Sequence, residues 1–256
     1  MCARRLAGLV LLTLVLAGCG GGGSGTATED GPLVVSAAAS LTSAFESYGA
    51  DFEGGGVRFS FAGSDELAAQ IRQGVKPDVF ASANTSLPAD LHAAGLVGTP
   101  RVFAANRLVL AVPAEGGDVA TLDDLTRPGV TVAVGSPTVP IGAYTRKVLD
   151  RLAPGPRDAI LANVRSEEPD VKGIVGKLTQ GAVDAGFVYI TDVTAAQGAL
   201  RAIELPAALK PSAAYAVAVV TGARHPAAAQ RFVDGLVDGA GQDALRAAGF
   251  APPPPS

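Results

Sequence analysis

The chain has 256 residues but contains two cysteines, two histidines, one methionine and no tryptophan. Cys2 and Cys19 both precede Gly20, so the body of the chain can form neither a disulfide nor a thiolate metal site. His92 and His225 lie far apart in the sequence and do not have the spacing of a zinc site. We therefore expect no metal ion and no cofactor.

Basic residues are also scarce. The sequence has 20 Lys and Arg against 24 Asp and Glu, and no basic stripe, which leaves nucleic-acid binding without electrostatic support. Loss of Arg4 and Arg5 with a cleaved leader would change the balance to 18 against 24. A bound anion would then depend on local geometry and not on the overall field. Hydrophobic residues make up 48%, enough for one large domain or two small ones.

The N-terminal segment indicates secretion. Arg4 and Arg5 precede an apolar run from Leu6 to Ala17, which is typical of a signal peptide and too short to span a bilayer. Leu16-Ala17-Gly18-Cys19 closes this run and resembles the lipobox of bacterial lipoproteins. The resemblance implies that Cys19 carries a lipid on the outer face of the cell membrane. The alternative is an ordinary signal peptide with an incidental cysteine.

Strand-like and helix-like segments alternate through the rest of the chain. Leu33–Ser36 fits a buried strand, and residues 57–61 alternate between apolar and polar with the period of a strand. Apolar residues in Val171–Leu178 are spaced i, i+3, i+4 and i+7, as on one helical face. This alternation predicts an α/β fold with mostly parallel sheets. Ligands of such folds gather at the carboxyl ends of strands, where helices begin.

Four strand-to-helix turns combine small residues with hydroxyl groups or a proline. They are AAASLT at 37–42, FAGSDEL at 61–67, GSPTVPIG at 135–142 and EPDVK at 168–172. A helix N-terminus carries unpaired N–H groups and a partial positive charge, so several such ends in one cleft would bind an anion. Ser40 and Ser64 could each be an ordinary N-cap instead. The recurrence of the pattern favours a shared anion cleft.

These turns resemble those of periplasmic molybdate-binding proteins, the substrate-binding components of ABC importers. Matching motifs follow in order over residues 33–250: AAASLT at 37–42, FAGS at 61–64, PDVFASA at 77–83, NRLVLAVP at 106–113, VPIGAY at 139–144, GFVY at 186–189 and YAVAVV at 215–220. The resemblance implies a two-lobed periplasmic-binding-protein fold of class II with a hinge of crossing strands. It also implies a monomer that captures molybdate or tungstate and delivers it to the permease and ATPase subunits of an importer.

The resemblance also implies a ligand set, and no catalytic residue. Ser40 and Ser64 would donate hydroxyl and backbone N–H groups to the oxyanion, Ile141 and Val171 would donate backbone N–H groups, and Tyr189 would donate its phenol hydroxyl. Tyr189 could also be a core aromatic residue. The assignment of Val171 depends on the shortest motif match.

One residue departs from the family pattern. Asp65 follows the second serine, where the family often has Ser or Thr. A carboxylate at the first turn of a helix is favourable if it faces solvent. In the cleft it would repel a dianion, and would suit a protonated oxyanion such as hydrogen phosphate.

The expected organisation follows from the order of these motifs, with chain crossings between lobes near 108–112 and 215–220. The segments are a signal peptide at 1–18, a flexible tether at 19–32, a first lobe at 33–107 and 221–250, a second lobe at 108–220 and a frayed proline-rich tail at 251–256.

Other functions remain open. A receptor for sulfate or phosphate would use the same kind of cleft. A surface-anchored hydrolase would need a base beside Ser40 or Ser64, and the sequence has no Gly-x-Ser-x-Gly elbow. A sensor or adhesion module would bind no oxyanion.

Overall fold

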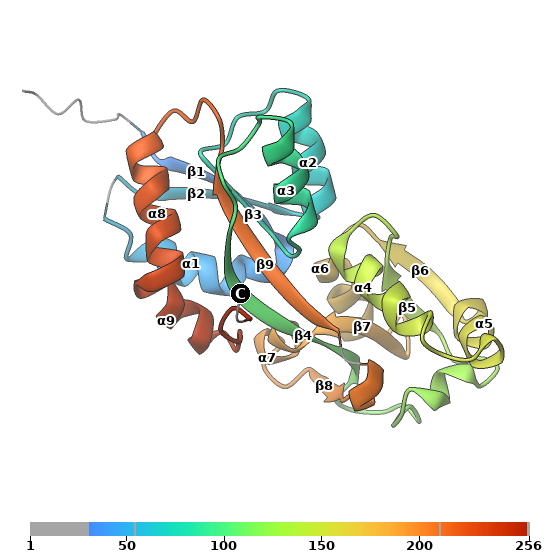
Figure 1. Ribbon diagram of the computed structural model, residues 1–256. Coiled ribbons are helices and arrows are strands. Elements are labelled where there is room, and N and C mark those ends of the chain that lie inside the picture. Colours follow the sequence, from blue (N-terminus) through green and yellow to red (C-terminus); the bar gives the residue numbers. More distant parts are fainter. Residues whose placement is uncertain (1–30, 54, 210, 255–256) are drawn as a thin grey trace, which may run out of the picture.

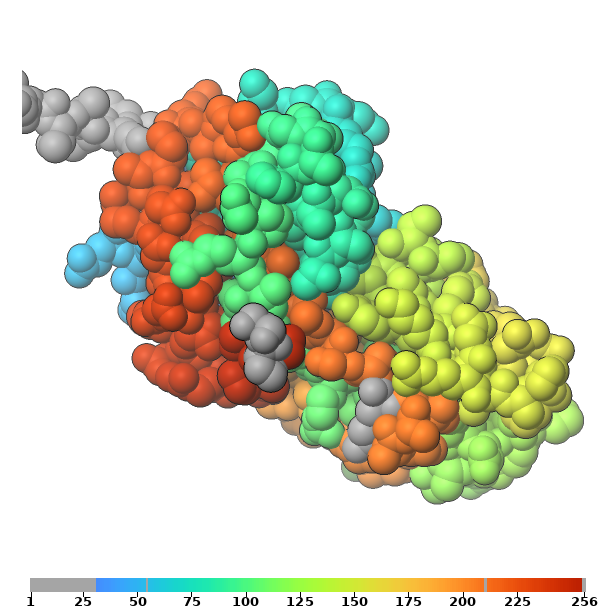
Figure 2. All heavy atoms as spheres, viewed as in Figure 1, coloured from blue at the N-terminus to red at the C-terminus, as the bar shows by residue number. Residues whose placement is uncertain are grey.

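The structure is a computed structural model that describes residues 31–53, 55–209 and 211–254. The expected signal peptide, Cys19 and most of the expected tether lie outside the described residues. Two lobes lie side by side, with the yellow and yellow-green residues gathered in the second (Figures 1 and 2). No helix in the described ranges is long and apolar enough to cross a membrane.

The first lobe contains a sheet in the order β2-β1-β3-β9-β4. Helix α8 contacts β4, β9 and α9, and α9 contacts α1; α2 and α3 contact each other and β3 (Figure 1). The elements are β1 (Leu33–Ala38), the 3-10 turn Ala39–Leu41, α1 (Thr42–Ala50), β2 (Val57–Ala62), α2 (Ser64–Arg72), β3 (Val79–Ser82), α3 (Ser86–Ala93), β4 (Arg101–Pro113), β9 (Ser212–Val219), α8 (Pro226–Asp238) and α9 (Ala240–Ala247).

The second lobe continues the order β4-β7-β5-β6, and β8 also pairs with β4. Helices α4 and α6 pack on β5 and β7. The elements are the 3-10 turn Asp123–Thr126, β5 (Val132–Gly135), α4 (Pro140–Leu149), α5 (Pro154–Ala162), β6 (Val164–Glu168), α6 (Val171–Thr179), β7 (Ala185–Tyr189), α7 (Ile190–Ala195), β8 (Leu200–Ile203) and the 3-10 turn Ala207–Leu209.

Strand β4 belongs to both sheets. Residues 101–107 pair with β9, and residues 108–113 pair with β7 and β8. The predicted crossing near residues 108–112 therefore falls on this strand. Strand β9 pairs with β3 and β4 in the first sheet, although the expected second lobe extended to residue 220. We propose that the chain re-enters the first lobe at Ser212.

The sheets are mixed, where the sequence predicted mostly parallel ones. The pairs β1–β2, β1–β3, β5–β6 and β5–β7 are parallel, but β3–β9 and the pairings of β4 with β7, β8 and β9 are antiparallel. The reason is that a chain leaving one lobe on β4 and returning on β9 must run these strands in opposite directions. The expected frayed tail begins at Ala251, which exchanges two backbone hydrogen bonds of 2.9 Å with Ala105.

Aromatic side chains fill the first lobe between its sheet and helices. The Phe45 ring of α1 lies 6.0, 6.1 and 5.7 Å from the rings of Phe59, Phe103 and Phe232, which come from β2, β4 and α8. Phe45 is fully buried. Burial of such large side chains fixes α1 against the sheet, and with it the turn that carries Ser40.

A buried carboxylate joins three elements at the other end of this sheet. Asp78 precedes β3; its Oδ2 accepts the Val34 N–H at 2.8 Å and lies 3.0 Å from His225 Nδ1. Its Oδ1 accepts the His225 N–H at 2.8 Å, at the start of α8. Burial alone would raise the pKa of Asp78, but the hydrogen bonds from His225 and Val34 outweigh it and hold this pKa below the usual value.

Asp78→Ala should lower the free energy of unfolding by about 3–5 kcal/mol, because removing one partner of a buried pair leaves the others unsatisfied. Since the folded-state pKa is lowered, this stabilisation is present above the unfolded-state pKa and is lost as pH falls through the folded-state value. Urea unfolding at neutral and acidic pH measures both effects. Asp90→Ala, on the exposed face of α3, is the control and should change stability little. Wild-type stability in Asp78→Ala would contradict this role.

Candidate functional site

One small pocket between the lobes gathers every predicted ligand residue. Its described lining includes Ser40, Ser64, Ile141, Val171 and Tyr189. About 210 Å³ of space there is not filled by atoms, a volume that includes open solvent. The remaining lining residues are Ala38, Ala39, Ala62, Gly63, Ala83, Val139, Pro140 and Asp170. The sequence interpretation thus identified five residues that the fold brings together from both lobes.

Three helices direct their N-termini to this pocket. Ser64 is the first residue of α2, Ile141 follows Pro140 at the start of α4, and Val171 is the first residue of α6. The first N–H groups of a helix have no partner within it and carry its positive partial charge. Their convergence makes the pocket suitable for an anion without a basic side chain.

Ser64 is not the N-cap of its helix. The cap is Gly63, and the Ser64 hydroxyl oxygen accepts the Ala83 N–H at 3.1 Å. Because that oxygen already accepts a hydrogen bond, its own hydrogen remains available for donation. Ser64 is 1% exposed, so a donation in the pocket would take place away from bulk water.

Ser40 lies in the 3-10 turn before α1 and also caps no helix with its side chain. Its hydroxyl lies 2.9 Å from the Tyr215 hydroxyl. Asn106 Nδ2 donates to Thr191 at 2.9 Å and, over a longer 3.5 Å, to Tyr215. If Tyr215 donates to Ser40, a chain of hydrogen bonds leaves the Ser40 hydrogen free for the pocket. Such chains polarise their members in the same direction.

Tyr189 ends β7 with a hydroxyl that has no partner among the described residues. The side chain is 1% exposed, and its hydroxyl oxygen is fully buried. Burial raises the pKa of Tyr189 well above 10, and the neighbouring Tyr215, Tyr144 and Asp192 add to the shift. Tyr189 therefore stays protonated as a donor. A buried hydroxyl without a protein partner is costly, and a bound acceptor would satisfy it.

Two carboxylates near the pocket differ in position. Asp65 is absent from the described lining of the pocket, and its Oδ1 lies 2.8 Å from the position that a Cβ atom on Gly63, a lining residue, would take. Asp170 lines it, but its Oδ1 accepts the N–H groups of Lys172 at 2.7 Å and Gly173 at 3.1 Å. Asp170 thus caps α6 through the second and third N–H groups of the helix, and the N–H of Val171 takes no part in these two hydrogen bonds.

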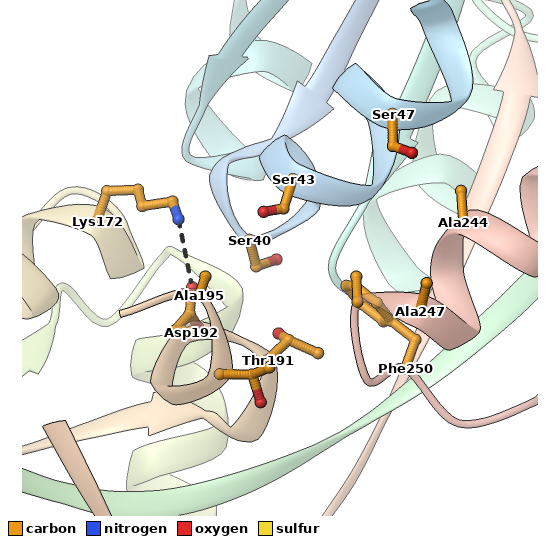
Figure 3. Close-up of a pocket in the computed structure, with 12 residues that line it drawn as sticks. Ser40, Ser43, Ser47, Lys172, Thr191, Asp192, Ala195, Ala244, Ala247 and Phe250 are labelled. Carbon is orange, nitrogen blue, oxygen red and sulfur yellow. Dashed lines mark ion pairs between the residues drawn. The ribbon is translucent and has the colours of Figure 1, made fainter. Parts of the chain in front are cut away.

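A wider cleft lies on the other side of Ser40 (Figure 3). Its lining includes Lys172 and Asp192, whose Nζ and Oδ1 atoms are 3.9 Å apart. Asp192 Oδ2 accepts the Tyr189 N–H at 3.1 Å, while Oδ1 is buried without a hydrogen bond from the described residues. Burial raises the pKa of Asp192 to about 7, although Lys172 and the Tyr189 N–H oppose the shift.

Neither histidine contacts the two pocket serines. His225 pairs with Asp78, and His92 Nδ1 lies 3.1 Å from the Val97 carbonyl. Among the described residues, the hydroxyls of Ser40 and Ser64 instead hydrogen-bond to Tyr215 and the Ala83 backbone. A serine nucleophile needs an adjacent base, so this arrangement gives no support to the hydrolase alternative.

The fold defines the class: a two-lobed α/β binding protein, here with a candidate ligand pocket between the lobes. The sequence profile of the family described as bacterial extracellular solute-binding protein matches residues 33–251. The chain belongs to this family.

Relatives and solved structures agree with that membership. The molybdate-binding protein ModA of Mycobacterium tuberculosis (strain H37Rv) is 39% identical over 227 residues, which cover 86% of this chain and 85% of the relative. The putative ABC transporter substrate-binding lipoprotein YvgL of Bacillus subtilis is 29% identical over 233 residues, covering 87% and 88%. The periplasmic molybdate-binding protein of Azotobacter vinelandii has a TM-score of 0.78 at 24% identity, covering 87% and 100%. The predicted two-lobed fold class is confirmed.

The sequence interpretation missed the residues that orient the donors. Tyr215, Asn106 and Asp192 were not assigned a role, yet they contact Ser40, Thr191 and the Tyr189 backbone. A signal was present in two cases, because Asn106 and Tyr215 carry polar atoms within otherwise apolar strands. Buried polar side chains need partners, and the partners are not recognisable before the fold is known.

Asp192→Asn should change how stability depends on pH. Because the folded-state pKa of Asp192 is raised, ionisation disfavours the fold, and wild-type stability should fall as pH rises from the unfolded-state pKa to about 7. Relative to the variant, we expect the wild type to lose about 1–3 kcal/mol between about pH 5 and about pH 8.5. Urea unfolding at both pH values measures the difference. Parallel pH profiles for the two proteins would contradict the raised pKa.

Proposed function

We propose that this protein captures molybdate, and tungstate equally, between its lobes and delivers it to the permease and ATPase subunits of an ABC importer. The observation that carries the proposal is the convergence of three helix N-termini with two serine hydroxyls and the unpaired, buried Tyr189 hydroxyl. The name of the M. tuberculosis relative supports molybdate as the ligand.

The donor set suits an anion that carries no proton. Molybdate and tungstate are fully deprotonated at neutral pH and need donors alone. The acid in the lining, Asp170, accepts two N–H groups of α6 through Oδ1 and so serves as the cap of that helix. Hydrogen phosphate would in addition need an acceptor for its own proton. Sulfate is the remaining alternative, and the size of the cleft decides between the two kinds of ion.

We further propose that Cys19 anchors the protein to the outer face of the cell membrane, as a monomer without a cofactor. The lipobox-like Leu16-Ala17-Gly18-Cys19 supports the anchor, as does the name of the B. subtilis relative, which describes a lipoprotein. An anchored receptor remains near its importer, and a short tether raises its effective concentration there.

Calorimetric titration of the mature chain should show binding of molybdate and tungstate and weaker binding of sulfate and phosphate. Ser40→Ala, Ser64→Ala and Tyr189→Phe should each weaken molybdate binding by about 1–3 kcal/mol, since each removes one donor to a desolvated anion. The three variants keep the shape of the pocket, so they test donation and not packing.

Ser43→Ala is the matched control, because Ser43 lines the wider cleft and not the small pocket. It should bind molybdate like the wild type. Wild-type affinity in both Ser40→Ala and Ser64→Ala would refute the site. Absence of binding for all four oxyanions would favour the sensor or adhesion alternative.

Gly63→Ala should weaken molybdate binding by preventing the lobes from meeting. A Cβ atom on Gly63 would lie 2.5 Å from the Pro169 carbonyl oxygen and 3.3 Å from Val139 Cγ2, both in the second lobe. The Gly63 backbone, at φ −58° and ψ 135°, suits alanine. Within the first lobe, the new Cβ atom would lie 2.8 Å from Asp65 Oδ1, so that half-buried side chain must move as well. Crowding of this kind costs about 1–3 kcal/mol, or roughly fivefold to a hundredfold in affinity.

Gly155→Ala on α5 is the control, because a Cβ there meets nothing within 4 Å. Small-angle scattering with saturating molybdate should show a larger radius of gyration for Gly63→Ala than for the wild type. Equal affinities and equal radii would show that Gly63 does not limit closure.

A further inference from the structure

A cleft on the first lobe gathers three basic side chains where the described chain begins. Arg58 on β2, Lys76 after α2 and Arg224 before α8 line it together with Gly31. All three basic residues are exposed. Figure 1 shows that the chain enters β1 at the end of the first lobe that faces away from the second lobe. The cleft is thus separate from the pocket between the lobes.

The three cations have no carboxylate within ion-pair distance in the part of the chain that the structure describes. By contrast, Arg101 and Arg107 on other surfaces pair with acidic side chains. The lining acid of the cleft, Asp78, is buried and accepts hydrogen bonds from Val34 and His225. In a chain with more acidic than basic residues, this cleft presents positive charge that no carboxylate of the described residues pairs with.

An exposed apolar side chain lies in the same cleft. Val75 is 50% exposed, the highest value among the large hydrophobic residues that the structure describes. It precedes Lys76 and also lines the cleft. Basic residues attract anionic headgroups, and an apolar side chain beside them gains from contact with the acyl boundary.

We propose that this cleft docks on anionic phospholipid headgroups of the membrane. The proposal rests on the proposed lipid anchor for its setting, because eleven residues, and so twelve Cα-to-Cα steps, separate Cys19 from Gly31. Such a segment spans at most about 43 Å when fully extended, which keeps the first lobe within reach of the bilayer. Contact through Arg58, Lys76 and Arg224 would orient the lobe on the membrane surface.

The test uses the unlipidated mature chain, residues 19–256 with Cys19→Ser, so that binding does not depend on the anchor. Flotation would compare vesicles of phosphatidylcholine with vesicles of equal parts phosphatidylcholine and phosphatidylglycerol. We expect binding to the anionic vesicles that weakens as salt increases. The combined variant Arg58→Gln, Lys76→Gln and Arg224→Gln should lose about a hundredfold in partitioning, at about fivefold per cation.

The matched control is Lys147→Gln, Arg151→Gln and Arg165→Gln, which removes the same charge from exposed positions on the second lobe. It should retain most of the binding. Equal loss in both combined variants, or equal binding to both kinds of vesicle, would overturn the proposal. Molybdate titration of the same samples separates the two proposals, because the cleft variant should keep wild-type molybdate affinity.

Discussion

The backbone pairing of β4 is the constraint on which the rest of the structure depends. Its first half is hydrogen-bonded to β9 and its second half to β7 and β8, so one strand is part of both lobes. Asn106 lies near the point where β4 passes from one sheet to the other. Its side-chain Nδ2 donates to the Thr191 hydroxyl, and its side-chain Oδ1 accepts the Arg107 N–H. The register of this ladder determines which turns of the two lobes face each other, and therefore which donors meet in the pocket.

A site made from uncharged donors depends on exclusion of water. The described lining of the pocket contains no Lys or Arg, so any attraction for an anion comes from helix N-termini and hydroxyl groups. The attraction between these dipoles and an anion is stronger where the local dielectric constant is low. The same burial raises the pKa of Tyr189 and Tyr215, which keeps both hydroxyls protonated. It also disfavours the ionised form of Asp192, whose negative charge would oppose an anion nearby.

Much of the fold and of the candidate site could be predicted from the sequence, because the informative features are local. Pro140 begins α4 as expected, and the apolar spacing of Val171–Leu178 corresponds to α6. The assignment of the five proposed ligand residues came from turn motifs and from family resemblance, and the fold brings these residues together. The antiparallel pairing of β9 with β3, the 2.9 Å contact of Ser40 with Tyr215 and the Asp78–His225 pair could not be predicted. Each joins residues far apart in the chain, and no local pattern encodes such partners.

The two candidate anion sites illustrate different physical solutions. In the proposed site, buried donors such as Ser64 and Tyr189 would match one small ion, and their geometry would provide selectivity. In the cleft, flexible and exposed side chains such as Lys76 and Arg224 remain hydrated, so they attract many headgroups with little selectivity and are screened by salt. In a protein with excess negative charge the overall field repels anions, so each kind of anion site must attract its ligand through nearby groups. Separating them at opposite ends of β1 keeps the exposed cations from competing for the ion that the buried donors select.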